Sequence, residues 1–495
     1  MSDYFWQLLA ILIYLVGMLF IGWYAYRRTK DFNDYMLAGR SLGPVVSALS
    51  AGAADMSGWL LMGLPGAIYA SGLTEAWIAI GLTIGAYLNW LFVAPRLRVY
   101  TQVSNDSITI PSFLDNRLKD KAKLLRIVSG IVIFVFFTFY VSSGMVAGGL
   151  FFQSSFDTFY HAGLLLISCV VALYTIFGGF LGVSLTDAVQ GTIMLFALLA
   201  VPVLGIFAAG GFAETAASIE AVNPNFTSLV KGATFFGVLS SLAWGLGYFG
   251  QPHIIVRFMA IKSVKETKRA RRVGIGWMIL SLLGAIAAAM IGLAYFQQNP
   301  EETLVSSETV FIKMGQILFH PFIAGIILSA VLAAIMSTIS SQLLVTSSAL
   351  VEDIYKALYK RDVSDKKAVA LGRIAVLAVF AIALILAWEQ DNTILNLVGF
   401  AWAGFGSSFG PIIILSLYWR KITGIGATAG MITGAVTSFV WGSLPISDTL
   451  YEMIPGFLLN LMVTYVISLI TYRKNQVIEE EFDRTLELLR EEKSA

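Results

Sequence analysis

One carboxylate stands alone in a long apolar run: Asp55 is the only charged residue in residues 44–70. A charge at membrane depth is costly, and such a residue usually marks a functional site. Ser57, Gly58 and Pro65 follow it, and these residue types weaken a continuous helix. Irregular backbone is tolerated inside a membrane only where it is buried in protein or lines a cavity. We therefore interpret this stretch as a broken helix whose carbonyls, hydroxyls and carboxylate face an ion or a small polar solute. The alternative is a kinked structural helix with a hydrogen-bonded, buried Asp55.

A second source of oxygen at membrane depth is the stretch AAIMSTISSQ, residues 333–342. Ser337 and Thr338 lie three and four residues after Ala334, so the three share one face of a helix. Sodium is a hard cation that prefers oxygen ligands, and helix breaks supply backbone carbonyls for it. The hydroxyls could instead bond to carbonyls of their own helix or pack between helices. On the residues alone, both interpretations stay open.

Aromatic residues flank the interrupted stretches, and they are candidates to contact an organic solute. Trp59 follows the first break, Tyr140 lies in another apolar span, and Trp244 and Tyr248 lie in a second glycine-rich stretch. The spacing of the last two predicts that they share a helix face. Such rings can pack against a compact aliphatic ring or a cation. The alternative is that they face lipid or the membrane interface, as many aromatic residues do.

The composition places these residues in a membrane protein. The 495-residue chain is 57% hydrophobic and 13% charged, against about 25% charged in ordinary soluble domains. Cys169 is the single cysteine and the three histidines are scattered, which excludes an internal disulfide and a zinc-type cluster. No nucleophile–base pair and no metal or nucleotide motif is visible. We expect a multi-pass membrane protein that is not an enzyme, has no cofactor and does not bind nucleic acid.

Windows of about 20 apolar residues predict thirteen membrane-spanning helices. Their approximate limits are 4–25, 44–70, 75–95, 125–153, 160–177, 183–209, 233–255, 274–296, 320–349, 369–388, 393–418, 424–443 and 452–471. The first window is too long for a cleavable signal, and no basic residue precedes it. With the N-terminus outside, the cytoplasmic segments hold 31 of the 33 Lys and Arg residues, as the positive-inside rule requires. The sequence therefore predicts an external N-terminus and a cytoplasmic C-terminus.

A second apolar span is also interrupted, because residues 242–255 hold three glycines and Pro252. The two breaks fall in the first helix of each of two consecutive five-helix units, spans two to six and seven to eleven. Since five is odd, the two units have opposite orientations in the membrane. Paired interruptions of this kind indicate an inverted-repeat transporter with its site near the midplane. The predicted division is a first helix and linker (1–43), a first repeat (44–209), an extracellular loop (210–232), a second repeat (233–419), two further helices (420–475) and a cytoplasmic tail (476–495).

Four segments carry a resemblance to a known family: Gly39–Ala67, Tyr174–Gln190, Trp244–Ala260 and Leu328–Leu350. DMSGWLLMGLPGA and WGLGYFGQPH are the most specific motifs within them. On these residues the chain resembles the sodium/solute symporter family, and within it the members that carry proline, through essentially all thirteen spans. The resemblance implies an all-α, LeuT-like core of spans two to eleven, with one extra helix before it and two after it. It also implies Na⁺/L-proline symport by alternating access across a cell membrane of bacterial type.

The resemblance further implies where the ligands bind. The residues implied for Na⁺ are the carbonyls of Ala53, Met56 and Ala334 and the hydroxyls of Ser337 and Thr338, with Asp55 required directly or nearby. The residues implied for L-proline are Ser57, Gly58, Trp59, Tyr140, Trp244, Tyr248 and Pro252.

Several alternatives stay open at this point. The solute could be another amino acid, a carboxylate or a sugar, and a proton could replace sodium. The chain could also be a membrane sensor, or a channel, with a transporter fold. Asp187 is interpreted as a helix N-cap, with an inner ion pathway as the alternative, and Arg40 as an orienting charge, with the inner mouth as the alternative. The oligomeric state is not predicted.

Overall fold

The computed structural model describes residues 3–28, 37–355, 365–389 and 393–494. Every regular element in those ranges is helical, apart from an isolated bridge of Leu42 with Ile261. The α-helices are α1 (Asp3–Arg28), α3 (Pro44–Asp55), α4 (Leu64–Ser71), α5 (Ala76–Leu88), α6 (Ala94–Val103), α7 (Ile110–Leu118), α8 (Leu124–Phe156), α9 (Tyr160–Ala208), α10 (Phe212–Val222), α11 (Phe235–Ala243), α12 (Pro252–Ala260), α13 (Val264–Gln298), α14 (Val310–Leu318), α15 (Pro321–Ser348), α17 (Asp365–Leu386), α18 (Ile394–Tyr418), α19 (Gly424–Gly442), α20 (Met453–Thr471) and α21 (Gln476–Ser494). The short 3₁₀ or π-helical segments are η1 (Ala38–Arg40), η2 (Trp59–Gly63), η3 (Leu73–Glu75), η4 (Asn89–Val93), η5 (Trp244–Gly250), η6 (Ser307–Thr309), η7 (Ala349–Tyr355) and η8 (Pro445–Asp448).

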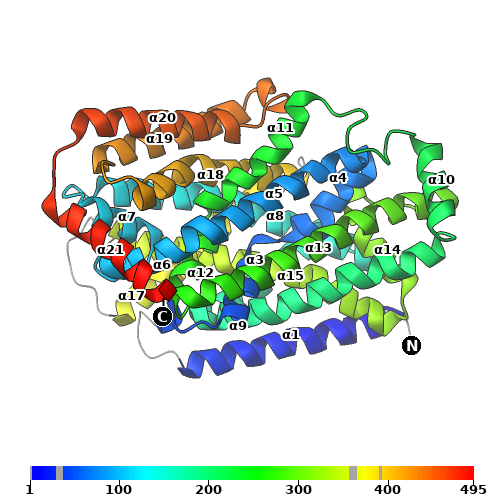
Figure 1. Ribbon diagram of the computed structural model, residues 1–495. Coiled ribbons are helices and arrows are strands. Elements are labelled where there is room, and N and C mark those ends of the chain that lie inside the picture. Colours follow the sequence, from blue (N-terminus) through cyan, green and yellow to red (C-terminus); the bar gives the residue numbers. More distant parts are fainter. Residues whose placement is uncertain (1–2, 29–36, 356–364, 390–392, 495) are drawn as a thin grey trace.

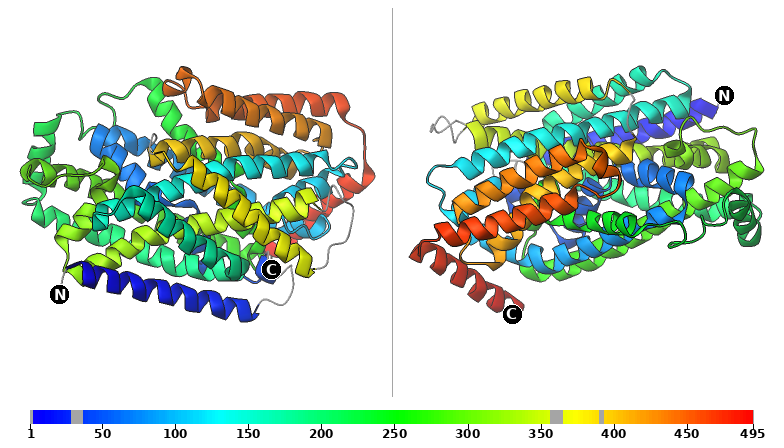
Figure 2. Two further views of the ribbon diagram at one scale, coloured as in Figure 1. Left: turned by 180° about the vertical axis from the view of Figure 1, so that it is seen from behind. Right: turned by 90° about the horizontal axis from the view of Figure 1, so that it is seen from above.

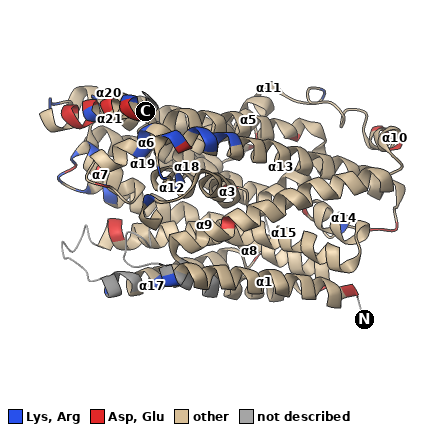
Figure 3. Cartoon of the chain, turned by 60° about the horizontal axis from the view of Figure 1, so that its bottom comes forward, with Lys and Arg blue, Asp and Glu red and all other residues tan. Residues whose placement is uncertain are grey.

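The long helices run side by side along one axis, so the bundle has two ends (Figure 1). The N-terminus, α10 and α14 lie at one end, here called the N-terminal end, and α7 and α21 lie at the other, the C-terminal end. Helix α1 lies along one side of the bundle and the pair α19–α20 along the opposite side (Figure 2). Lys and Arg residues gather toward the C-terminal end (Figure 3).

Helix length and composition fit a membrane protein. Within the described ranges, nine helices are long and apolar enough to cross a membrane, and a bent pair, α3 with η2–α4, makes up to ten. Three shorter apolar helices lie at Tyr160–Ala172, Phe235–Gly250 and Ala370–Leu386. Each of the thirteen predicted windows falls on one of these helices.

The first predicted break is present. Helix α3 ends at Asp55, the chain bends by 62°, and a π-helical turn, η2, leads into α4. Pro65 lies in the first turn of α4, where its missing amide hydrogen costs little. Gly58 is required by packing, since an added Cβ would lie 2.9 Å from the Cβ of Ala147 in α8. The break in this helix is therefore packed against α8 inside the bundle.

The second predicted break is present too, with a different geometry. Helix α11 passes into a 3₁₀ segment, η5, and Gln251 takes an extended conformation before Pro252 opens α12. Small residues let η5 lie against its neighbours: a Cβ on Gly250 would overlap the backbone of α18. Close backbone approach of this kind explains why the segment is rich in glycine.

The predicted spans at 160–177 and 183–209 both lie in α9, which consists of two helices that meet at a kink at Gly179. Gly179 has φ 59° and ψ 180°, in the region of positive φ that glycine adopts readily. Helix α15, which carries the Ser/Thr cluster, is the most enclosed of these long helices together with α18, with 83% of its apolar window buried. It packs against α1, α8, α9 and α3, so its polar residues face protein.

Candidate functional site

The break after α3 frees a backbone carbonyl in the middle of the bundle. In a continuous helix the amide of Ser57 would donate to Ala53 O, but it donates to Asp55 O instead, at 2.9 Å. Met56 leaves the helix with φ −81° and ψ 79°, while its amide still donates to Gly52 O at 2.8 Å. The carbonyl of Ala53 is thereby free to meet side chains of another helix.

The side chains that meet it are the two hydroxyls of α15. Ser337 Oγ lies 2.8 Å from Ala53 O and 3.1 Å from Ala334 O, and Thr338 Oγ1 lies 3.4 Å from Ala53 O. All four residues are buried. We call these four residues the oxygen cluster. Met56 lies in the break beside it, but no hydrogen bond links Met56 to these hydroxyls in the described ranges.

The carboxylate of Asp55 contacts the second broken helix. Its Oδ2 accepts a hydrogen bond from the hydroxyl of Tyr248 in η5, and within the described chain its buried Oδ1 has no hydrogen-bond partner. Asp55 and Tyr248 line a cavity of about 20 Å³ together with Asn89 and Met278. An unpaired buried carboxylate oxygen is costly, and this cavity has room for a water molecule or an ion beside it.

Most of the residues implied for the solute surround this same break. Trp59 Nε1 donates to Asp55 O at 3.0 Å, and the Tyr140 hydroxyl donates to the same carbonyl at 3.4 Å. Ser57 Oγ accepts from the amide of Trp59 at 3.4 Å. Trp59 and Tyr140 are each 1% exposed. The structure thus places Ser57, Trp59, Tyr140 and Tyr248 around one point of the chain.

Trp244 and Pro252 lie apart from that group. Trp244 stacks on Tyr451, with ring centroids 5.5 Å apart, and lines a cavity of about 630 Å³ toward the N-terminal end. Pro252 lines a cavity of about 20 Å³ that also includes Thr109 and Asp353, toward the C-terminal end. Trp244 therefore lies on the N-terminal side of the group around Asp55, and Pro252 lies on its C-terminal side.

The prediction that Trp244 and Tyr248 share a face differs from what the structure shows. Both residues lie in the 3₁₀ segment η5, where residues three apart are eclipsed and residues four apart are not. Their rings accordingly have different neighbours. Trp402 connects them: its Nε1 donates to Trp244 O at 2.7 Å, and its ring meets that of Tyr248 edge-on at 5.0 Å.

Asp187 is not a helix cap, because it lies inside α9. It is fully buried, and its Oδ2 lies 2.8 Å from Ser50 Oγ and 3.1 Å from Arg257 Nη2. Arg257 also donates to Ser50 Oγ at 3.1 Å and to Ser341 Oγ at 2.7 Å. Arg257 lies two residues beyond the predicted span 233–255, so the sequence prediction placed it among the cytoplasmic charges, although its apolar neighbours in α12 were a sign of burial. This ion pair ties α3, α9, α12 and α15 together close to the break.

Arg40 is likewise more than an orienting charge. Its guanidinium meets Asp106 at 2.9 Å and donates to Thr101 Oγ1, Met259 O and Ser107 O at 3.0, 2.9 and 2.8 Å. Burial lowers the pKa of Arg40 from its ordinary value, and Asp106 opposes that shift. Arg40 therefore joins the segment before α3 to α6 and α12.

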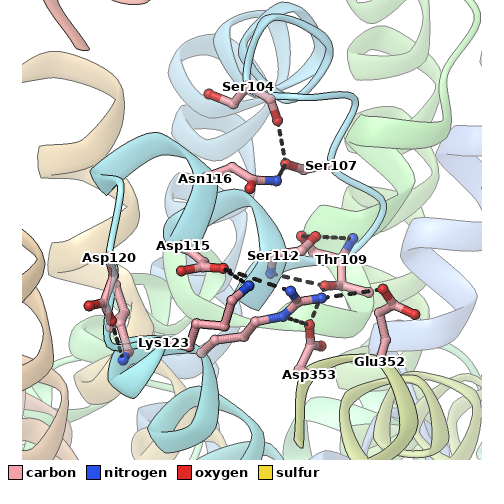
Figure 4. Close-up of polar contacts among 12 residues, drawn as sticks. Ser104, Ser107, Thr109, Ser112, Asp115, Asn116, Asp120, Lys123, Glu352 and Asp353 are labelled. Carbon is pink, nitrogen blue, oxygen red and sulfur yellow. Dashed lines mark hydrogen bonds and ion pairs between the residues drawn. The ribbon is translucent and has the colours of Figure 1, made fainter. Parts of the chain in front are cut away.

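An ion-pair network that the sequence analysis missed lies at the C-terminal end (Figure 4). Arg126 Nε contacts Asp353 Oδ1 at 2.9 Å and Arg126 Nη2 contacts Glu352 Oε1 at 3.3 Å, while Thr109 Oγ1 donates to Asp353 Oδ1 at 3.0 Å. Asp115 contacts Lys123 at 3.4 Å and Arg126 at 3.7 Å. The network joins α7 and α8 to the end of η7. It bounds the small cavity beside Pro252, since Thr109 and Asp353 belong to both.

The site combines groups that bind rather than react. Carbonyls, hydroxyls and a carboxylate come together without a basic side chain in contact with them in the described structure, which suits a cation. Aromatic rings and a helix break surround them, which suits a small zwitterion or polar solute. An interrupted-helix bundle with such a centre defines a membrane transporter fold.

Comparison with known proteins agrees with a membrane transporter. The signature of the Sodium:solute symporter family matches residues 35–434. The chain belongs to that family. It is 60% identical to the "High-affinity proline transporter PutP" of Bacillus subtilis over 94% of this chain and 98% of that one. It is 49% identical to a "Sodium/proline symporter" of Staphylococcus aureus over 99% and 98%.

Solved structures support the fold alone. A Na⁺-coupled sialic acid symporter in a substrate-bound outward-open state superposes with a TM-score of 0.81 at 19% identity, over 96% of this chain and 100% of that one. Mhp1, a nucleobase-cation-symport-1 family transporter in a closed conformation, gives a TM-score of 0.54 at 14% identity, over 90% and 97%. The expected transporter-type architecture is thereby confirmed.

Proposed function

We propose that this protein is a secondary-active symporter that couples uptake of L-proline to inward movement of Na⁺ across a bacterial cell membrane. The observation that carries the proposal is the oxygen cluster, where Ser337 and Thr338 of α15 meet the carbonyl freed by the break after α3. This is an oxygen-rich, buried set of the kind that Na⁺ prefers. Two relatives support the proposed ligands: the 60% identical one is a proline transporter, and the 49% identical one is a sodium/proline symporter.

The proposed topology has thirteen spans, with the N-terminus outside and the C-terminus in the cytoplasm. It has two five-helix repeats, 44–209 and 233–419, in opposite orientations. The N-terminal end of the bundle is then external and the C-terminal end cytoplasmic. The gathering of Lys and Arg toward the C-terminal end supports this orientation.

Proline would lie against the break, bordered by Ser57, Gly58, Trp59, Tyr140 and Tyr248. Its carboxylate suits the unpaired amides at the start of a half-helix, and its ammonium suits carbonyl oxygens. Its compact ring suits the aromatic side chains. Trp244 would border the solute on the external side and Pro252 on the cytoplasmic side.

Sodium would couple to proline through the broken helix itself. Na⁺ at the oxygen cluster would replace the hydroxyl–carbonyl hydrogen bonds with ion contacts and fix α3 against α15. The neighbouring backbone at Ser57 and Gly58 would then be ordered for proline. By linkage, sodium raises proline affinity and proline raises sodium affinity by the same factor. Asp55 would act from the other side of the break, through Tyr248 and the cavity beside its free oxygen.

The available driving force is adequate for concentrative uptake. One Na⁺ moving inward through about 100 mV releases about 2.3 kcal/mol, and a tenfold sodium gradient adds about 1.4 kcal/mol. One-to-one coupling could therefore support a proline gradient of roughly a few hundred-fold.

The deciding experiment is radiolabelled L-proline uptake into proteoliposomes with an imposed inward Na⁺ gradient, beside K⁺ and pH-gradient controls. Sodium-dependent uptake that overshoots equilibrium is expected. Sodium-dependent uptake of a different solute would reject proline and keep the ion site. Uptake driven by a pH gradient without sodium would reject sodium as the coupling ion, and equilibration without overshoot would reject coupled transport.

A further inference from the structure

A cavity on the far side of Trp244 from the break has acidic walls to which the proposed mechanism gives no role. Its volume is about 630 Å³, and its walls come mainly from α5, α11, the first turns of α18 and the segment that joins α19 to α20. We call it the outer vestibule. Three carboxylates line it, from Glu75, Asp448 and Glu452, and none of its lining residues in the described chain is Lys, Arg or His. A cavity of this size with charges of one sign focuses the field on its interior.

Glu452 is the most informative of the three carboxylates. The residue is only 6% exposed, and no Lys, Arg or His side chain in the described ranges pairs with it. Buried carboxylates are normally paired with a cation or a hydrogen-bond donor, because desolvation of an isolated charge is costly. Glu75 is half-buried and also has no cationic partner among the described residues. These two carboxyl groups therefore line the vestibule without a Lys, Arg or His partner among the described residues.

The rest of the vestibule wall offers further ligands for a cation. Ser241 and Asn396 contribute oxygen-bearing side chains, and the stacked rings of Trp244 and Tyr451 form part of the lining. Hydroxyl and amide oxygens can coordinate Na⁺, and aromatic faces attract cations.

A continuous set of contacts leads from the vestibule to the buried site. Trp244 stacks on Tyr451, the neighbour of Glu452 in the chain. Trp402 then links Trp244 to Tyr248, whose hydroxyl contacts Asp55. The aromatic layer therefore separates the acidic vestibule from the carboxylate at the break.

We propose that the outer vestibule is a second cation site, which captures Na⁺ from the external medium before the ion reaches the oxygen cluster. The proposal rests on the proposed function for the identity of the ion and for the orientation of the bundle. It also gives the segment between α19 and α20, which lies outside the proposed five-plus-five core, a part in transport, because this segment supplies Asp448 and Glu452.

The test measures the electrostatics of the vestibule by thiol chemistry. Ser241 becomes a single cysteine (Ser241→Cys) in a Cys169→Ser background, because Cys169 is exposed. Intact cells are treated with membrane-impermeant methanethiosulfonates, one carrying a trimethylammonium group and one a sulfonate. Each rate is divided by the rate of the same reagent with a small free thiol. The cationic reagent is expected to react about tenfold faster than the anionic one by this measure.

Charge removal then identifies the carboxylates responsible. Glu452→Gln and Glu75→Gln are each expected to lower the cation preference about threefold, and both together more. The matched control is Glu220→Gln, the same change on an exposed carboxylate in α10 that does not line the vestibule. Equal rates for the two reagents, no labelling from outside, or an equal effect of Glu220→Gln would overturn the proposal.

Protection experiments assign the cation. At constant ionic strength, replacing choline by Na⁺ should slow the cationic reagent, and Glu452→Gln should abolish that protection. Protection by L-proline without sodium, or equal protection by choline, would overturn the sodium assignment.

In uptake assays, Glu452→Gln should raise the half-saturating Na⁺ concentration and leave the half-saturating proline concentration at saturating Na⁺ unchanged. The reagent rates do not depend on transport, so a failure of proline uptake and a failure of the vestibule site are separate results.

Discussion

The hydroxyl of Tyr248 donates a hydrogen bond to the carboxylate of Asp55, and this contact joins the two interrupted helices across the centre of the bundle. The two residues are 193 positions apart in the chain, one in each proposed repeat. Alternating access in an inverted-repeat transporter moves one set of helices against another around the site. Because this hydrogen bond joins the two breaks, an ion that binds beside Asp55 could change the position of both interrupted helices.

The first prediction concerns this pair. Asp55→Asn should abolish or severely reduce sodium-stimulated proline uptake without loss of membrane insertion, because the change removes the only charge at the break. Tyr248→Phe keeps the ring and removes the donor. A hydrogen bond to a charged group contributes about 1.5–3 kcal/mol, so transport efficiency should fall roughly tenfold or more. The readout is uptake against sodium concentration, at matched protein levels in the membrane. Normal uptake at low sodium in Asp55→Asn would remove Asp55 from the mechanism.

A second prediction concerns the oxygen cluster. Ser337→Ala and Thr338→Val should each raise the half-saturating Na⁺ concentration about tenfold or more, since a loss of about 1.4 kcal/mol corresponds to a tenfold change. Proline affinity at saturating sodium should change much less. Ser340→Ala is the control, because Ser340 Oγ donates to Ser337 O of its own helix at 3.0 Å. If Ser340→Ala raised the sodium requirement as much as the other two changes, the cluster would not be the ion site.

A third prediction separates a buried ion pair from an exposed one. Asp187→Asn leaves Arg257 charged and fully buried, and breaking such a pair costs about 3–5 kcal/mol. Asp106→Asn removes a partner of Arg40 that is 59% exposed, for which about 0–1 kcal/mol is expected. Thermal unfolding in detergent should therefore show a large fall in midpoint for the first variant and a small one for the second. Similar midpoints would mean that the Asp187–Arg257 pair does not hold the four helices together.

The fourth prediction is a pH dependence at the C-terminal end of the bundle. Burial raises the pKa of Asp115 above its ordinary value, although Lys123 and Arg126 oppose the shift. A raised pKa means that the folded state holds the proton more tightly than the unfolded state. The contribution of this carboxyl to stability therefore falls as pH rises from the unfolded-state pKa through the folded-state pKa.

Asp115→Asn removes that titration. The variant should gain stability relative to the wild type as pH rises above the ordinary pKa of an aspartate, about 4. Unfolding midpoints at several pH values measure the difference, with Asp448→Asn, a change on an exposed carboxylate, as the control. A difference between Asp115→Asn and the wild type that shrinks as pH rises would contradict the prediction.

The amino-acid sequence determined the features that depend on local composition and spacing. An apolar window predicts a helix wherever it occurs, and Ser57, Gly58, Pro65 and Pro252 disrupt helices through their own backbone chemistry. The two breaks and the shared face of Ser337 and Thr338 are therefore predictable from the sequence alone. The resemblance of the motifs around them supplied the family, which the comparisons confirm.

The tertiary structure decided everything that depends on which distant segments meet. Asp187 looked like a cap and Arg257 like a loop charge, but α9 and α12 both pack against α3 and α15, and this arrangement buries the two as a pair 70 residues apart. Trp244 and Tyr248 were placed on one face because their spacing suits an α-helix, and packing of η5 against α5 and α18 made that segment 3₁₀ instead. The three carboxylates of the outer vestibule come from segments that no local pattern connects. Periodicity reports the environment of one helix, whereas ion pairs, cavities and stacked rings are set by contacts between helices.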